Sequence, residues 1–272
     1  MSGAANSGMA APQQRAAAWR FNNSLPIAAG LAALMLLWWV GGVLLRTDPA
    51  TAAFAGFAPG PALAKFFQLG ASGDLFAASA VSLGRVMSGL LMAIVIGVPT
   101  GIAIGRIPVL KQATLIPFQF LRMISPLSWM PIAVLVFPGW NGAIIFLIIM
   151  AAVWPVIFAT ANGVAKIDPS WLKVARNLRA SPVQRITAVI VPAIAQDVLT
   201  GIRLALGVAW IVLVPAEYLG VSSGLGYEIN DARDSLDYAR LAAIVLTIGL
   251  IGFTLDALCD LVIRRFGWKI GE

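Results

Sequence analysis

Long apolar segments alternate with short polar connections along most of this 272-residue chain. A helix that crosses a membrane needs about 20 predominantly apolar residues. Six segments meet this requirement, at residues 26–45, 79–105, 112–137, 141–163, 198–220 and 238–263. The pattern predicts an all-α integral membrane protein, in which residues 25–272 form a single domain, a bundle of six transmembrane helices.

The third apolar segment differs from the others because prolines interrupt it. Pro117, Pro126 and Pro131 lie within it, and Pro138 lies at its edge. Proline removes a backbone donor and clashes with the preceding turn, so this helix must be kinked or broken. Backbone groups that are freed at membrane depth need partners other than lipid. We therefore expect the break to face protein or a water-filled cavity.

The polar connections differ in length and character. Residues 1–24 are small, polar and rich in Gly and Ala, which predicts a disordered cytoplasmic tail. Residues 46–78 are weakly apolar, and we expect them to lie partly ordered on the outer face. Residues 166–196 form the longest polar interruption between two apolar segments, and we expect this loop to contact a partner in the cytoplasm.

Composition and charge support a membrane protein and orient it. The chain is 60% hydrophobic and 11% charged, whereas soluble domains have about a quarter charged residues. If the N-terminus is cytoplasmic, 12 of the 19 Lys and Arg residues fall on the cytoplasmic side and three on the outer side. The positive-inside rule therefore predicts that both termini are cytoplasmic. Because the cations flank spans, the net charge of +7 does not indicate a nucleic-acid partner.

The residue types that are missing exclude several kinds of chemistry. The chain has no histidine and a single cysteine, Cys259, so a transition-metal site and a cysteine–histidine catalytic pair are excluded. No phosphate-binding P-loop motif occurs. We therefore expect no enzymatic activity and no cofactor in this chain. If transport is driven by ATP, a second polypeptide must supply the energy.

The loop at 166–196 predicts two short helices with their own caps. Asp168 is a candidate N-cap followed by Pro169 at the first helical position. Ser181 and Gln184 have the spacing of a capping box, and Pro192 ends or kinks the second helix. Five cations lie in this loop, which indicates either docking to a protein partner or contact with anionic lipid headgroups. We favour docking because lipid contact requires no capped turn.

Arginine and glutamate within the apolar segments are the best candidates for transport chemistry, because ionisable groups in a membrane are costly unless paired or hydrated. Arg122 lies well inside the third segment, where a guanidinium suits either a passing oxyanion or the backbone carbonyls of a broken helix. Arg85 and Glu217 lie near the outer ends of their segments, and we expect them to pair.

The remaining polar and aromatic positions in the spans have more than one interpretation. Arg203 lies near the inner end of its segment, where snorkelling to the interface explains it. Asp256 and Asp260 are one turn apart and face either a partner helix or Arg240. Three tryptophans either line a pathway or pack within the bundle, at Trp129, Trp154 and Trp210.

The chain resembles a known protein family in this loop and in several spans. The loop resembles the EAA loop of ABC-importer permeases, a pattern of Glu-Ala-Ala, three residues, Gly, nine residues and Ile-x-Leu-Pro. Here the matching positions are residues 173–175, 179 and 189–192, with Ala175 and Pro192 conforming and Lys173 and Arg179 departing from the Glu and Gly. Further likeness to the nitrate/sulfonate/bicarbonate branch lies at residues 82–101, 125–131, 154–155, 201–207 and 215–217, and covers 76–262 overall.

The resemblance implies a six-helix type I permease subunit in a bacterial inner membrane. Such a subunit works with a second permease copy, in a homodimer, with two cytoplasmic ABC ATPase subunits that bind ATP and Mg, and with a periplasmic or lipid-anchored solute-binding protein. The residues assigned to ATPase coupling are Trp171, Leu172, Lys173, Ala175, Arg176, Leu178, Arg179, Ala180, Ser181 and Pro182. Those assigned to the substrate pathway are Arg122, Ser125, Trp129, Trp154, Arg85 and Glu217.

The predicted function is import of a small oxyanion, of the nitrate or bicarbonate type or a sulfonate such as taurine, by alternating access. Import of a small organic solute by the same kind of complex is one alternative. A stand-alone secondary transporter is another, since a broken span with a buried arginine would also serve it. A membrane-embedded enzyme is disfavoured because the chain lacks histidine and clustered acids.

Overall fold

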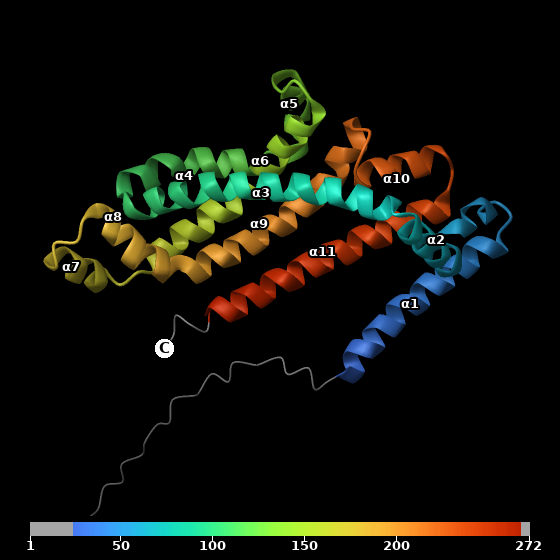
Figure 1. The fold of residues 1–272 in the computed structure, drawn as a ribbon, viewed down its shortest axis with the longest axis horizontal. Helices are drawn as coiled ribbons and strands as arrows, with labels where there is room; N and C mark the ends of the chain where they lie inside the picture. The colour runs from blue at the N-terminus through green and yellow to red at the C-terminus, as the bar shows by residue number, and fades with distance from the viewer. Residues whose placement is uncertain (1–23, 268–272) are drawn as a thin grey trace, which may run out of the picture.

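The computed structural model describes residues 24–267, and these residues form helices and no strands. The tail expected to be disordered lies outside the described residues, except for Ser24, which begins the first helix. The helices, in order, are α1 Ser24–Thr47, η1 Ala52–Phe57, α2 Pro59–Ser72, α3 Asp74–Arg106, α4 Pro108–Met123, η2 Pro126–Trp129, α5 Met130–Val136, α6 Trp140–Ala165, α7 Pro169–Asn177, α8 Pro182–Arg185, η3 Ile186–Ile190, α9 Val191–Gly220, α10 Leu225–Asp234 and α11 Tyr238–Gly267. Figure 1 shows the long helices running side by side along the molecule.

The spanning helices agree with the six predicted segments. Among the described residues, five helices are long and apolar enough to cross a membrane, and a bent helix pair brings the number to six. That pair is α4 with α5, which meet at 88° across a short break. The predicted interruption of the third segment is therefore confirmed, and in Figure 1 α5 projects away from the other helices. Pro126 and Pro131 each lie in the first turn of a new helix, where a missing N–H costs little.

The core of the bundle is made by α3, α6 and α9. Buried aliphatic side chains from these helices form one continuous cluster, including Val86, Leu147 and Leu213. Glycines allow α3 and α6 to approach closely: a Cβ at Gly97 would lie 2.8 Å from a methyl carbon of Val156, closer than real side chains pack. Small residues at helix contacts are a common means of close packing in membranes.

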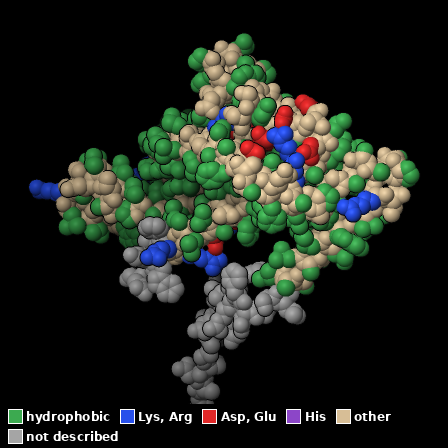
Figure 2. All heavy atoms as spheres, turned by 45° about the vertical axis from the view of Figure 1, so that its right-hand side comes forward, with side chains coloured by type: hydrophobic (Ala, Val, Ile, Leu, Met, Phe, Trp, Pro, Cys, Tyr) green, Lys and Arg blue, Asp and Glu red, His purple; other side chains and the backbone are tan. Residues whose placement is uncertain are grey.

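The connections that were predicted for the outer face are more ordered than expected. Residues 46–78, expected to be partly ordered, contain η1 and α2, which pack against α11. Phe54 and Phe57 surround the ring of Tyr238 with centroid distances of 4.9 and 5.2 Å. The acidic connection at 221–237 contains α10, and Figure 2 shows acidic and basic side chains gathered over this region of an otherwise largely uncharged surface.

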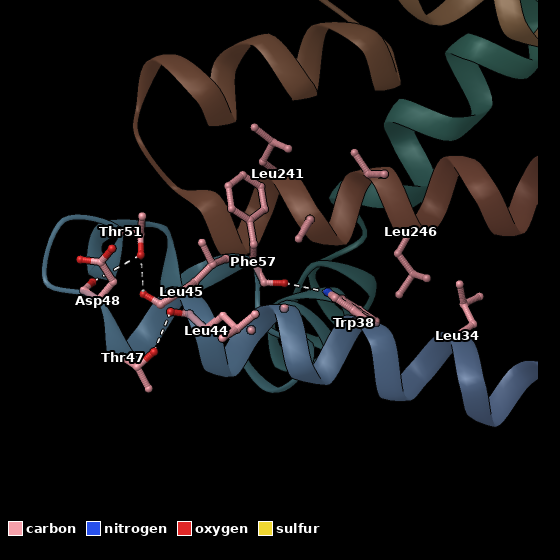
Figure 3. A pocket seen from close by; sticks show the side chains of 14 residues that line it. Leu34, Trp38, Leu44, Leu45, Thr47, Asp48, Thr51, Phe57, Leu241 and Leu246 are labelled. Carbon is pink, nitrogen blue, oxygen red and sulfur yellow. Dashed lines mark hydrogen bonds between the residues drawn. The ribbon is translucent and has the colours of Figure 1, made fainter.

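The first helix is the least embedded part of the fold. Only 6% of its most apolar window is buried within the chain. Its outer half is fastened by a hydrogen bond in which the Trp38 indole Nε1 donates to the Phe57 carbonyl at 2.8 Å. An apolar crevice of about 1010 Å³ lies between α1 and the N-terminal half of α11. Figure 3 shows residues that line it, such as Leu34, Trp38, Leu241 and Leu246. We call this the α1–α11 crevice.

Candidate functional site

The loop between α6 and α9 forms the predicted capped helix pair. The Asp168 carboxylate accepts a hydrogen bond from the Ser170 backbone N–H at 2.8 Å and caps α7. This bond holds the pKa of the Asp168 carboxyl below its usual value. The capping box is complete, because the Ser181 N–H donates to Gln184 Oε1 at 2.8 Å and the Gln184 N–H donates to Ser181 Oγ at 3.2 Å. Both predicted caps are confirmed.

A left-handed residue closes α7. Arg179 has φ of +55°, a region that non-glycine residues seldom adopt. The Ala180 N–H donates to the Ala175 carbonyl and the Arg179 N–H to the Arg176 carbonyl, both at 3.0 Å. These two bonds form a Schellman motif, which favours glycine at the left-handed position. Arg179 is the position where the EAA pattern has glycine, so the chain keeps the turn although it lacks the residue that suits it best.

One face of α7 presents apolar side chains to the outside. Trp171, Val174 and Leu178 are 55%, 57% and 77% exposed, and they follow helical spacing. They line a groove of about 430 Å³ together with residues of η3 and α9. Lys173, Arg176 and Arg179 are exposed around this face. Exposed apolar and basic side chains on one capped helix suit a protein partner with an apolar groove and an acidic rim.

The structure divides the ten residues that were assigned to coupling. Ala175 is only 7% exposed, because the chain's own helices cover it. Leu172 is half-buried and packs against a small cluster of Val164, Ile190 and Ile194. Ser181 and Pro182 start α8, and Ala180 joins the two helices. The exposed residues of the loop are therefore only part of the predicted coupling set. Val174 is also exposed and was not in that set, although its spacing from Trp171 and Leu178 would have found it.

Two contacts between α4 and α6 lie beside the break in the third span, and each involves one predicted pathway residue. The Arg122 guanidinium lies 5.3 Å from the centre of the Phe158 ring, and the Phe118 ring lies edge-on to Trp154 at 5.4 Å. Both contacts join α4 to α6, one helical turn apart. Within the described residues, the side-chain hydrogen bond of Arg122 is to Gln119 at 3.4 Å, so the alternative in which Arg122 bonds the backbone carbonyls of the broken helix is not observed. Ser125 and Trp129 flank the same break.

Arg85 and Glu217 form the predicted ion pair across the bundle. Arg85 Nη1 lies 2.5 Å from Glu217 Oε1, and the side chains are 6% and 0% exposed. Arg85 Nε also donates to Asn141 Oδ1 at 2.8 Å, and Nη1 to the Ser223 carbonyl at 2.8 Å. Ser82 donates to the Glu217 carboxylate at 2.8 Å. We call these five residues the outer ion-pair cluster, which joins α3, α6, α9 and the turn before α10.

Backbone groups complete the cluster on the side of the carboxylate. The Gly226 N–H donates to Glu217 Oε2 at 3.0 Å, and the Leu225 N–H donates to Ser82 Oγ at 2.9 Å. Gly224 has φ of +105°, and a Cβ there would collide with the Glu217 carboxylate. A buried charge is tolerated when it is paired and its remaining lone pairs are satisfied. In this conformation the cluster fastens helices together.

One prediction about charged residues in the spans is wrong, and one pair of alternatives is resolved. Arg203 does not snorkel, because it binds Asp256 through two bonds of 2.8 and 2.7 Å and Asp260 at 2.7 Å. Of the two alternatives for Asp256 and Asp260, the structure therefore supports a partner helix, α9. Arg240 pairs instead with Glu228 and Asp231 of α10. The signal for the first pairing was in the sequence: two acids one turn apart on the last span, opposite a single arginine on the preceding span.

Comparison with known proteins decides the family. Residues 93–268 match the model of the binding-protein-dependent transport system inner membrane component, which covers more than half of the chain. The chain belongs to this family. The resemblance seen in the loop and spans is thereby confirmed, as is the all-α type I permease fold.

Curated relatives place the chain close to anion permeases of this family. It is 33% identical over 250 residues to the bicarbonate transport system permease protein CmpB of Synechocystis sp., covering 87% of this chain and 86% of that protein. It is 37% identical over 196 residues to the nitrate import permease protein NrtB of Leptolyngbya laminosa, covering 72% and 70%. A probable ABC transporter permease protein of Brucella melitensis is 31% identical over 245 residues, covering 89% and 94%.

Membership settles the general role of the chain. It is an inner-membrane permease subunit of an ABC importer and not an enzyme, since ATP hydrolysis belongs to a separate subunit. It associates with an ATPase and with a substrate-binding partner, as permeases of this family do.

Proposed function

We propose that this chain is the permease subunit of an ATP-driven importer that moves a small oxyanion of the nitrate or bicarbonate type into the cytoplasm by alternating access. The observation that carries the proposal is the exposed face of α7. A capped, basic helix with three exposed apolar side chains at the end of the bundle is suited to receive motion from another subunit. The named relatives, which are bicarbonate and nitrate permeases, support the oxyanion.

One continuous helical segment would transmit a displacement of α7 to the transmembrane helices. Residues Pro182–Gly220 form a helical segment of 39 residues that includes the π-helix η3. The small cluster around Ile190 and Ile194 ties α7 and the end of α6 to this segment. When the partner ATPase binds ATP and Mg and closes, α7 would move with it. The displaced segment would then tilt α9 against α3 and α6, a shear-type transition.

The substrate would pass the broken span. Arg122 is the one exposed cation at this break, among the residues that the structure describes, and it makes no ion pair there. A guanidinium with free donors binds planar oxyanions through two parallel hydrogen bonds. The Phe158 ring behind it holds the guanidinium plane by a cation–π contact. Ser125 and Trp129 flank this position, and Trp154 lies on the neighbouring helix face.

The importer would contain two copies of this chain. A helix with 6% of its apolar window buried is under-packed for a bundle on its own. The α1–α11 crevice is almost wholly apolar and is open along its length (Figure 3). A helix from a second copy would fill it. With both termini cytoplasmic, as the Lys and Arg distribution favours, each copy would place its α7 on the side of the ATPases.

The experiment that tests this function is ATP hydrolysis by the complex reconstituted with its ATPase and binding protein in lipid vesicles. Nitrate, bicarbonate, cyanate, taurine and alkanesulfonates are compared at equal concentrations. Stimulation by one oxyanion is the expected result. Stimulation by a neutral organic solute alone would refute the oxyanion, and gradient-driven uptake by the purified chain without any ATPase would refute the importer.

A further inference from the structure

A second crevice lies at the end of the bundle that carries the loop, and it combines apolar walls with two arginines. Its volume is about 490 Å³. The walls come from the last two turns of α3 and from α8 and η3, and they are lined by Pro99, Ile102, Ala103, Arg106, Ile107, Pro182, Arg185, Ile186 and Ile190. We call this the basic crevice. It is separate from the α7 face and from the broken span.

The charges of the basic crevice are not compensated by the protein. No acidic residue lines it, and neither Arg106 nor Arg185 forms an ion pair within residues 24–267. The Nε–H of Arg185 is buried and has no hydrogen-bond partner in the same part of the chain. A buried donor without a partner is unfavourable, so an acceptor from outside the chain would relieve it. The acceptor that two guanidiniums recognise best is a phosphate or carboxylate.

The position of the basic crevice indicates that the acceptor belongs to a phospholipid and not to a protein partner. Arg106 is the last residue of α3, a helix long and apolar enough to cross a membrane, so it would lie at the membrane boundary. Pro99, Ile102 and Ala103 precede it by up to two turns and would lie deeper in the span. A site with cations at the boundary and aliphatic walls below it matches a phospholipid, whose headgroup phosphate is followed by acyl chains. A peptide of a protein partner would have to place its backbone at hydrocarbon depth, where its polar groups lack partners.

We propose that the basic crevice binds an anionic phospholipid, with the phosphate between Arg106 and Arg185 and one acyl chain against the wall formed by Ile102, Ile186 and Ile190. The bound lipid bridges span α3 and the segment that begins α9. The bridge falls at η3, where the loop joins the α9 span. This segment is a π-helix, a geometry that is frequent at functional sites. The proposal stands whether or not the transported solute is an oxyanion.

Lipid retention by the full-length chain tests the proposal. The purified protein is freed of lipid in neutral detergent and titrated with phosphatidylglycerol or phosphatidylcholine of the same acyl chains, and bound lipid is counted by native mass spectrometry. The wild type is expected to prefer phosphatidylglycerol. Arg106→Gln and Arg185→Gln should each weaken its binding about fivefold, the effect of about 1 kcal/mol for each basic residue near the surface.

Controls separate this site from general surface charge and from a free-anion site. Arg265→Gln removes an exposed cation near the end of α11, outside the crevice, and should change phosphatidylglycerol binding less than twofold. Ala103→Phe fills the apolar part while keeping both arginines, and should weaken binding of both lipids. If inorganic phosphate displaces the lipid at equal concentration, or if the three crevice variants all bind like the wild type, the proposal is wrong. Size-exclusion profiles and melting curves identify the variants that fold, and only these variants are compared with the wild type.

Discussion

At the scale of single residues, this permease holds several side chains in positions that their own preferences oppose. Arg179 adopts a left-handed conformation that favours glycine, and Glu217 is fully buried in a membrane protein. Each is stabilised by its neighbours: two backbone hydrogen bonds close the Arg179 turn, and the outer ion-pair cluster surrounds the Glu217 carboxylate. Substitutions at such positions separate the contribution of the residue from that of its surroundings.

Arg179→Gly should stabilise the end of α7. A left-handed conformation costs an L-residue about 1–2 kcal/mol, and glycine avoids most of this cost. We expect about fivefold slower hydrogen exchange across the turn at residues 176–181. Arg179→Asn, which also removes the charge and tolerates the conformation better than Arg, should exchange at a rate between those of the wild type and the glycine variant, and Arg179→Val should exchange faster than the wild type. Equal exchange in the glycine and valine variants would contradict the left-handed turn.

Glu217→Gln should destabilise the bundle strongly. Removing one partner of a buried ion pair leaves the Arg85 guanidinium uncompensated, which costs about 3–5 kcal/mol. Glu228→Gln, at the partly exposed pair with Arg240, should cost about 1 kcal/mol or less. Thermal unfolding in detergent compares the two variants. A similar loss in both would show that the outer ion-pair cluster does not fasten the helices.

Arg122→Gln should reduce uptake about ten- to hundredfold, the range expected for losing a charge-assisted hydrogen bond to a substrate. Arg122→Lys keeps the charge but loses the planar fork, so uptake should fall by less. Radiolabelled uptake into vesicles is the measurement, and co-purification of the ATPase checks that the complex still assembles. If the glutamine variant no longer assembles, Arg122 is a structural residue, and its place in the substrate pathway is refuted.

At the scale of elements, the loop between α6 and α9 acts as an elbow with one inner and one outer face. Ala175 faces inward against the chain, while Trp171, Val174 and Leu178 face outward. A charge at Ala175 would therefore disturb the folding of the elbow before it disturbed docking. The informative substitutions are those on the outer face, because they leave the capping bonds and the small cluster under α7 unchanged.

Leu178→Glu should weaken capture of the ATPase at least about tenfold, since docking would bury an unpaired charge. Val109→Glu is a matched control: Val109 is 75% exposed, close to the 77% of Leu178, and lies at the start of α4 on the same side of the membrane. It should leave capture unchanged. Pull-down of the ATPase by solubilised permease measures both. Normal capture of the ATPase by the Leu178→Glu variant would show that the contact with the ATPase does not lie on this face of α7.

The elements that were predicted correctly depend on neighbours close in sequence. Span positions follow from apolar length, the caps at Asp168 and Ser181 from three- or four-residue patterns, and the break in the third span from its prolines. Contacts between distant segments were predicted only in part: the pair of Arg85 and Glu217, 132 residues apart, was predicted, whereas the partners of Arg203, 53 and 57 residues away, were not. The side of α7 that faces inward also depends on the path of η3 and α9, which periodicity alone does not give.

At the scale of the whole molecule, the bundle is densely packed around α3, α6 and α9 and open toward α1. Buried side chains concentrate on the three central helices, while α1 leaves most of its surface uncovered. Val245 and Leu250 illustrate the difference on α11, because both are about half exposed but only Val245 lines the α1–α11 crevice. A second copy would bury the first of them.

Val245→Trp should lower the fraction of permease pairs by filling the crevice that a second copy would occupy. Leu250→Trp makes the same change five residues away on another face of α11 and should leave pairing intact. Mass measured by light scattering during size-exclusion chromatography in detergent distinguishes one copy from two. Equal pairing of both variants and the wild type would place the contact between copies elsewhere.

The outer ion-pair cluster has a consequence for biosynthesis. Arg85 and Glu217 are 132 residues apart, and ribosomes add about 5–20 residues per second. Glu217 is therefore synthesised roughly ten seconds after Arg85. During this time the guanidinium, near the outer end of its helix, has only headgroups and water to neutralise it. The nascent protein thus passes through a long-lived, incompletely assembled stage, and membrane-bound chaperones or proteases have that interval in which to act on it.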